Sequence, residues 1–382
     1  MSVYVLAPDA LEWTQESNKK LKIKMEAQCK RVGSNIPYAP RNGKYHDMDF
    51  PNSDGISWWT NGFWTGMLWQ MYNATKDTMY RKAAEDIEKR LDEALFNFEG
   101  LHHDVGFMWL HSAVANYRLT GNKTSRRRGL NAATLMAGRY NPLGKFIRAW
   151  NDDCTGWIII DTMMSLPMLY WASHELNDPR FAAIAMHHAD TCLENAIRAD
   201  GSCNHISILD PFTGTCMENP GGQGYESGSS WSRGHSWALY GFVLSYYYSK
   251  QVRYLNAAKR IAHYFIANLA LNDWLPLVDF RAPAQPVKYD STAAMCACCG
   301  LLEIAKHVGE HEKPLYVNAA MKILQSCEAA FCNWNPYEDG IMYGGAASYH
   351  GNGYDASTAI IYGDYFFVEA LLRLEGQSFL IW

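Results

Sequence analysis

The sequence predicts an all-α fold in which six outer and six inner helices alternate along the chain and close into a double ring. The first observation is that charged helical stretches alternate six times with stretches poor in charge and rich in small and aromatic residues. An amphipathic helix faces water on one side, whereas a helix that is apolar all round must be buried. The second observation is that strand-like alternation appears only in short pieces such as 204–209, which argues against a sheet fold.

The first half of the chain holds three of these outer–inner pairs. Asp9 is a plausible N-cap of the first outer helix, and Gly33 ends it. Asp77 or Thr78 caps the second outer helix, whose many charged residues leave only a narrow apolar face. The predicted pairs are 9–32 with 61–73, the helix capped at 77 or 78 with 105–119, and 123–138 with 158–175.

The second half holds the other three pairs. Pro179 and Pro314 each fit the first turn of an outer helix, where a proline loses no hydrogen bond. The predicted pairs are 178–198 with 232–249, 252–269 with 291–307, and 314–330 with 356–374. The longest loops all precede inner helices, so they gather at one end of the ring, where a functional site is expected. These loops are 34–57, 139–156, 199–230 and 331–355.

Composition narrows the class of protein. No linker or low-complexity tract divides the 382 residues, so we expect one domain over 1–382. The 14 Trp and 23 Tyr suit flat, polar ligands such as sugars. The net charge of −5, without a basic stripe, argues against nucleic acid, and no apolar run approaches the roughly 20 residues of a membrane span. We expect a monomer or a homodimer.

The cysteines and the common motifs point to a cytoplasmic protein without a cofactor. The ten cysteines show neither zinc-type spacing nor a disulfide framework, and the N-terminus lacks the pattern of a secretory signal. No metal-protease, calcium-loop, phosphate-loop or dinucleotide motif occurs. The pair His102-His103 is adjacent, so on a helix its rings would diverge. We therefore predict no metal and no cofactor.

Two aspartates are candidates for acid–base chemistry. Asp104 and Asp161 stand near the starts of two successive inner helices, so their carboxylates can converge. In a dry pocket their repulsion would keep one protonated near neutral pH. The alternative is that each is an N-cap. For Asp161 this alternative is weaker, because the residue lies in the apolar run 158–164, where an uncompensated charge is costly.

The stretch 219–237 combines a glycine-rich loop with a helix start that carries Trp231, Arg233 and Trp237. An arginine at a helix N-terminus can bind an anion such as a substrate carboxylate. The alternative is a core tryptophan pair with Arg233 bridging backbone carbonyls. His205, in the preceding strand-like piece, is either a hydrogen-bond donor to a ligand or an ordinary buried histidine.

Several of these blocks together resemble the unsaturated glucuronyl hydrolases, glycoside hydrolase family 88. The blocks that carry the resemblance span nearly the whole chain: 103–108, 149–151 with 156–161, 230–234 with Trp237, 290–291 and 362–367. The resemblance implies an (α/α)6 barrel, in agreement with the twelve-helix prediction. It also implies substrates left by polysaccharide lyases, which end in a 4,5-unsaturated uronic acid.

The resemblance assigns roles residue by residue. Asp161 matches the catalytic acid/base and Asp104 the second essential carboxylate. The implied chemistry is hydration: Asp161 protonates C4 of the vinyl ether and assists water at C5, and the hemiketal collapses to release the next sugar. The positions that match substrate-contacting residues are His205, Gln223, Trp231, Arg233 and Trp237, together with the wall residues Trp59, Phe63, His103 and Trp150.

Other functions remain as alternatives. An unsaturated rhamnogalacturonyl hydrolase acting on pectin fragments is the nearest one. A sugar epimerase on the same barrel would need paired histidines where this chain has paired aspartates, and a non-catalytic sugar-binding module would leave Asp161 without a role. The late loop 346–355 has hydroxyl groups but no Lys or Arg, which leaves a preference for sulfated substrates undecided.

Overall fold

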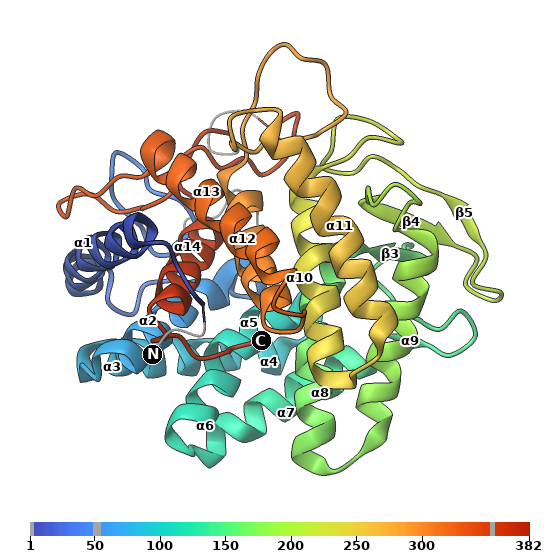
Figure 1. Ribbon diagram of the computed structural model, residues 1–382. Coiled ribbons are helices and arrows are strands. Elements are labelled where there is room, and N and C mark those ends of the chain that lie inside the picture. Colours follow the sequence, from blue (N-terminus) through green and yellow to red (C-terminus); the bar gives the residue numbers. More distant parts are fainter. Residues whose placement is uncertain (1–3, 49–54, 352–355) are drawn as a thin grey trace.

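The computed structural model describes residues 4–48, 55–351 and 356–382 and confirms the double ring of helices (Figure 1). The outer helices are α1 (Pro8–Val32), α3 (Thr78–Arg90), α7 (Lys123–Ala137), α9 (Pro179–Asn195), α11 (Val252–Ala270) and α13 (Lys313–Phe331). The inner helices are α2 (Phe63–Thr75), α5 (Val105–Trp109) continued by α6 (Ala115–Thr120), α8 (Leu166–Leu176), α10 (Ser232–Ser249), α12 (Ser291–Ala305) and α14 (Ile361–Leu374). A short helix, α4 (Asp92–Asn97), follows α3.

Burial separates the two rings as the sequence predicts. Every residue of α12 and of α14 is buried, whereas α3 and α11 bury one face and expose the other. The inner helices pack in the order α2, α5–α6, α8, α10, α12 and α14, and the contact of α14 with α2 closes the ring. The turn Leu110–Val114 between α5 and α6 is π-helical, and it completes the second inner helix.

The axis of the ring is filled at the end of the chain by Trp382, which is fully buried. Its ring stacks on Phe366 with centroids 5.8 Å apart, and its Nε1 donates to Glu369 at 3.0 Å. Beside it, Arg373 forms ion pairs with Glu303 at 2.6 Å and Glu369 at 2.7 Å. Burial alone would raise the pKa of Glu303, but His307 and Arg373 outweigh it and hold that pKa low.

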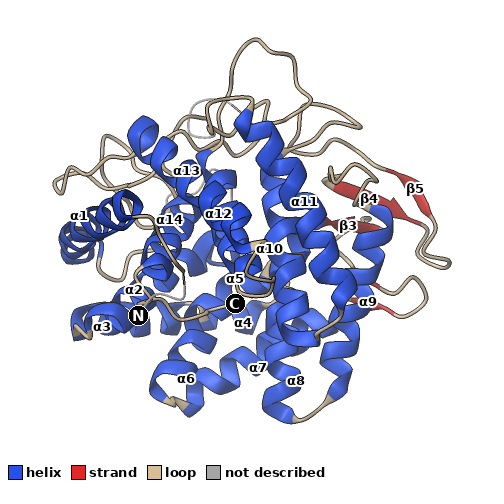
Figure 2. Cartoon of the chain, viewed as in Figure 1, coloured by secondary structure: helices blue, strands red, loops and turns tan. Residues whose placement is uncertain are grey.

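The structure corrects the third inner helix. Residues 158–175 do not form one helix: β3 (Trp157–Ile159) and a 3-10 turn (Ile160–Met164) precede α8. Successive isoleucines favour a strand, and β3 pairs antiparallel with β4 (Ile206–Leu209), which in turn pairs with β5 (Cys216–Glu218). This small sheet lies at one side of the ring (Figure 2). A second hairpin pairs β1 (Tyr140–Asn141) with β2 (Phe146–Ile147).

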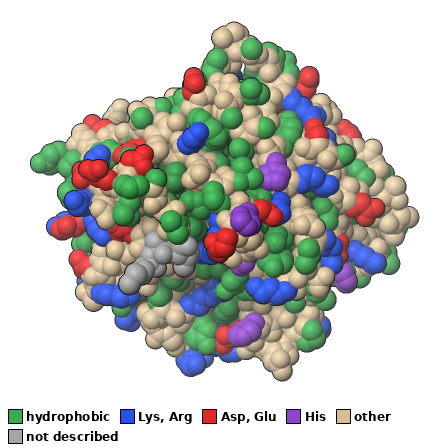
Figure 3. All heavy atoms as spheres, viewed as in Figure 1, with side chains coloured by type: hydrophobic (Ala, Val, Ile, Leu, Met, Phe, Trp, Pro, Cys, Tyr) green, Lys and Arg blue, Asp and Glu red, His purple; other side chains and the backbone are tan. Residues whose placement is uncertain are grey.

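The structure also tests the start of the last inner helix, the absence of a membrane span and the distribution of surface charge. The sixth inner helix begins at Ile361 rather than at 356, and residues 352–355 of the late loop lie outside the described residues. Within the part of the chain that the structure describes, no helix combines the length and apolar character needed to cross a membrane. On the face shown in Figure 3, acidic and basic side chains are interspersed.

Candidate active site

The predicted site residues gather at the end of the ring where the inner helices begin. Asp104 directly precedes α5, and Asp161 lies in the 3-10 turn before α8. Gly106 and Ser165 bring these two segments into contact, because the Gly106 amide donates to Ser165 Oγ at 3.2 Å. A Cβ at position 106 would lie 2.4 Å from the Cα of Ser165, so only glycine permits this approach. The charges of both aspartates act on His103, which lies between them.

Asp104 is held in its ionised form by two histidines. His103 Nε2 lies 3.1 Å from one carboxylate oxygen, and His102 Nδ1 lies 3.4 Å from the other. Burial would raise the pKa of Asp104, but His103 and His102 outweigh it and lower that pKa. The Asp104 carboxylate makes no capping hydrogen bond to α5, so its partners are the histidines rather than the helix.

Both ring nitrogens of His103 have a partner. Its Nδ1 lies 2.8 Å from the carbonyl oxygen of Ala149, to which it donates, and its Nε2 faces Asp104. Burial lowers the pKa of His103, but the charge and hydrogen bond of Asp104 outweigh burial and raise it. The same carbonyl accepts from Arg139 Nη2 at 3.0 Å, which fixes the loop that carries Trp150.

Asp161 has a different neighbour. Because Ile159 pairs with Ile206 in the β3–β4 ladder and the Ile160 amide donates to the carbonyl of His205 at 3.0 Å, the sheet places His205 beside Asp161. His205 Nε2 and Asp161 Oδ1 are 3.5 Å apart. Both atoms are buried, and neither makes a hydrogen bond with the described residues. Buried polar atoms without partners are rare, and here two of them face each other at the limit of hydrogen-bond distance.

Aromatic side chains form the wall and floor of the site. Trp59 stacks on Tyr362 with centroids 5.0 Å apart and meets Phe63 edge-on at 5.9 Å. Trp59 and Trp150 are partly buried, whereas Phe63 and Trp237 are fully buried, so the first two form the wall and the others the floor. Trp150 packs edge-on against His103 at 5.6 Å.

Arg233 is buried with an exposure of 1% and bridges backbone carbonyls, as the alternative interpretation proposed. Its Nη1 donates to Asp290 at 2.8 Å and to the carbonyl of Ala346, and its Nη2 donates to the carbonyl of Ala347. Its guanidinium lies 4.4 Å from the ring of Trp231. Only its Nε lacks a hydrogen-bond partner among the described residues, so most of the guanidinium holds the late loop.

Gln223 and Trp231 complete the predicted set. The Gln223 side chain donates to the carbonyl of Ala347 at 2.6 Å, so it too fastens the late loop. Trp231 packs against His205 with ring centroids 4.3 Å apart. The structure thus brings all the predicted site residues to one end of the ring. Two contributors went unassigned at the level of sequence: Tyr362 and Asp290, both of which lie in the blocks that carry the family resemblance.

His102, His103 and Asp104 form a candidate metal-binding group. The argument that the two histidines diverge on a helix is wrong, because they lie in a turn with their rings stacked at 4.8 Å. One ligand atom from each of the three residues lies within 4.8 Å of the others. In this structure the Asp104 carboxylate is already paired with His103, so a metal would have to replace that ion pair.

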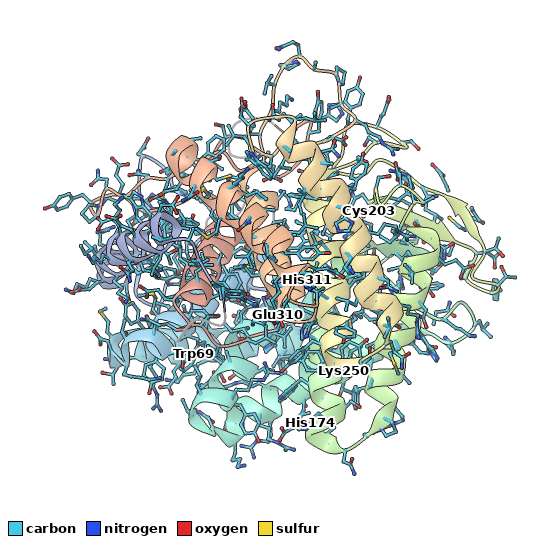
Figure 4. The ribbon with its side chains drawn as sticks, viewed as in Figure 1. Trp69, His174, Cys203, Lys250, Glu310 and His311 are labelled. Atoms are coloured by element: carbon cyan, nitrogen blue, oxygen red, sulfur yellow. The ribbon has the colours of Figure 1, made fainter. Side chains whose placement is uncertain are left out.

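A large cavity lies at the opposite end of the inner helices. It has a volume of about 1100 Å³ and is lined by Tyr117, Tyr170, Tyr247 and Lys250, among others. Figure 4 labels His174 and Lys250 at this end, far from Cys203, which lies near the His205 end of the molecule. Two carboxylates line this cavity: Arg126 and Tyr117 bind Glu175, and Arg180 binds Asp178. The predicted acid–base residues Asp104 and Asp161 lie at the other end of the ring.

The fold and this site are those of a carbohydrate-active hydrolase, and comparisons with known proteins give the family. The model of glycosyl hydrolase family 88 matches residues 30–270. The chain is 34% identical to an unsaturated glucuronyl hydrolase of Bacillus sp. strain GL1, over 90% of this chain and 96% of that protein. It is 32% identical to an unsaturated chondroitin disaccharide hydrolase of Streptococcus pneumoniae, over 88% and 86% of the two chains.

A comparison with solved structures points to the same family as the sequence relatives. The crystal structure of the unsaturated glucuronyl hydrolase from Bacillus sp. GL1 superposes with a TM-score of 0.87 at 32% identity, covering 95% of this chain and 97% of that one. The chain belongs to glycosyl hydrolase family 88 and is a glycoside hydrolase.

Proposed function

We propose that this enzyme removes the terminal 4,5-unsaturated uronic acid from oligosaccharides that polysaccharide lyases produce, with glycosaminoglycan-type disaccharides as its main substrates. The relatives named for unsaturated glucuronyl and chondroitin disaccharide substrates support the substrate class. The observation that carries the chemistry is the unequal environment of the two carboxylates. His103 and His102 lower the pKa of Asp104, whereas Asp161 Oδ1 lies 3.5 Å from His205 Nε2 and makes no hydrogen bond with the described residues.

In the proposed reaction, Asp161 is the acid and then the base. It delivers a proton to C4 of the C4=C5 vinyl ether, and the positive charge that develops is shared by C5 and the ring oxygen. Water then adds at C5 and loses a proton to Asp161, which restores the catalyst. The resulting hemiketal opens and releases the next sugar. Asp104, held as an anion, stabilises the positive charge that forms near C5.

The other site residues bind the substrate in this proposal. Trp59 and Trp150 offer partly exposed aromatic faces to the sugar rings, with Phe63 and Trp237 packed beneath them. His205 and Gln223 supply hydrogen-bond donors, His103 holds Asp104 in place, and Trp231 faces the ring of His205. The unpartnered Nε of Arg233 is the one part of that side chain directed to ligand binding.

Isotope labelling tests the reaction. A panel of lyase-generated disaccharides, including pectin fragments, is followed by loss of the ultraviolet absorbance of the conjugated double bond. Turnover in deuterated water should place deuterium stereoselectively at C4, because one side chain delivers it from one face. Turnover in ¹⁸O-water with prompt trapping should place the label at C5. Label at the anomeric carbon, with no deuterium at C4, would mean ordinary glycoside hydrolysis.

We also propose the setting in which this site works. Residues 1–382 act as one catalytic domain in the cytoplasm, as a monomer or a homodimer, without a metal or cofactor. Light scattering on the purified protein measures the oligomeric state, and turnover after treatment with a chelator tests the metal requirement. Fractionation of the source cells tests the compartment.

A further inference from the structure

His205 has a backbone partner that determines where its ring hydrogen lies. The amide nitrogen of Gln223 is 3.0 Å from His205 Nδ1. A backbone N–H can only donate, so Nδ1 is the acceptor and carries no hydrogen. The ring hydrogen of His205 is therefore on Nε2, the atom that faces Asp161 Oδ1 at 3.5 Å.

His103 and His205 thus make opposite hydrogen bonds at Nδ1: His103 donates there, and His205 accepts. His103 Nδ1 faces the carbonyl of Ala149 and must donate to it, so its second nitrogen can also carry a hydrogen and the ring can be cationic. His205 Nδ1 faces an N–H, which excludes a second hydrogen as long as that bond is intact. The hydrogen bonds of His103 thus permit a cationic ring beside Asp104, whereas Asp161 meets a neutral donor.

We infer that the backbone N–H of Gln223 is a positioning group for catalysis: it keeps His205 neutral with its hydrogen on Nε2, and so leaves Asp161 free to carry the proton that the reaction needs. A cationic His205 would favour the ionised form of Asp161 and remove that proton. The bond to Gln223 hence leaves the acid role to Asp161. The kinetic part of this inference rests on the proposed function, whereas the tautomer of His205 does not.

Glycine at position 222 makes this bond possible. Gly222 has φ of 59°, and a Cβ added there would lie 2.0 Å from His205 Nδ1. Only a residue without a side chain lets the loop bring its next amide against the imidazole. The loop is itself fastened, since Tyr349 N donates to the Gln223 carbonyl at 2.9 Å and the Gln223 side chain donates to Ala347. The late loop, held by Arg233, thereby supports the amide that faces His205.

The test is Gly222→Ala beside a matched control in the same loop. Gly228 also has a positive φ, of 79°, but a Cβ there would meet nothing within 4 Å. Both substitutions place an alanine at positive φ, and only the first brings a Cβ against His205. We expect kcat of Gly222→Ala to fall about 10- to 100-fold below that of Gly228→Ala, the effect of losing one hydrogen bond to an ionisable site.

Long-range ¹H–¹⁵N spectra of the protein with labelled histidine read the tautomer directly, with His205→Gln used only to assign the signal. In the wild type at neutral pH, His205 should show hydrogen on Nε2 alone, and Gly222→Ala should lose that single state. A wild-type His205 with its hydrogen on Nδ1, or on both nitrogens, would overturn the inference even if the variant failed to fold. So would equal kcat in the two glycine variants. A wild type that turns over none of the disaccharides would refute the proposed function and leave the tautomer result standing.

Discussion

Replacing Asp161 with asparagine separates catalysis from folding more cleanly than any other change at this site. Asparagine keeps the shape of the side chain but has no proton to transfer, so kcat should fall by about 10²- to 10⁴-fold. That loss equals about 2.7–5.5 kcal/mol of transition-state stabilisation. Stability should barely change, because Asp161 Oδ1 makes no hydrogen bond with the described residues and its nearest partner, His205, is 3.5 Å away.

The matched control is Asp104→Asn, which removes the carboxylate that pairs with His103 and His102. It should lower both turnover and stability, the latter by about 1.5–3 kcal/mol, the usual range for a hydrogen bond to a charged group. Turnover is measured from the loss of ultraviolet absorbance, and stability from urea unfolding of both variants. Near-normal turnover of Asp161→Asn, or an equal loss of stability in the two variants, would refute the assignment of the proton to Asp161.

Three further predictions follow from the contacts. The pKa of His103 is raised, so the stabilisation from its protonated form is complete below its ordinary pKa of 6.5 and is lost as pH rises through the higher folded-state value. The difference in unfolding free energy between wild type and His103→Gln should therefore shrink as pH rises above 6.5. Arg233→Lys should lower stability by about 1–3 kcal/mol, because one ammonium cannot reach Asp290 and both carbonyls of the late loop, and an unchanged melting temperature would contradict this. Arg373→Met should lower the free energy of unfolding by about 3–5 kcal/mol in denaturant, since it leaves Glu303 and Glu369 buried without their cation. Arg180→Met, which breaks an exposed pair with Asp178, should leave the free energy of unfolding nearly unchanged.

The ring of helices could be predicted because it depends on local pattern. Whether a helix is amphipathic or apolar all round is visible in the residues themselves, and that alternation assigns each helix to the outer or the inner ring. Capping residues marked the starts of two outer helices. Asp77 caps α3 by accepting from the amide of Met79, and Asp178 caps α9 by accepting from that of Arg180. The alternation, with the placement of the long loops, also located the end of the ring where Asp104 and Asp161 lie.

The prediction of a helix from residue 158 was wrong for a reason that local pattern does not contain. The run 158–160 is apolar and fits a buried helix or a buried strand equally well. Pairing with β4, whose residues lie more than forty positions further along the chain, decides for the strand. That pairing moves Asp161 from the inside of a helix to a turn beside His205, which is the contact on which its proposed role depends.

The sequence by itself predicted the class of fold, the end of the ring at which Asp104 and Asp161 lie, and these two carboxylates as the candidates for acid–base chemistry, because helix periodicity and residue type are properties of short segments. Only the tertiary structure decided how the two carboxylates differ. The difference comes from the backbone group that each histidine faces: the carbonyl of residue 149 faces His103, and the amide of residue 223 faces His205. The tertiary structure also decided that Arg233 mainly holds the late loop. Each of these depends on which backbone group a distant loop brings within 3 Å, and hydrogen-bond partners across such separations are set by packing and not by local pattern.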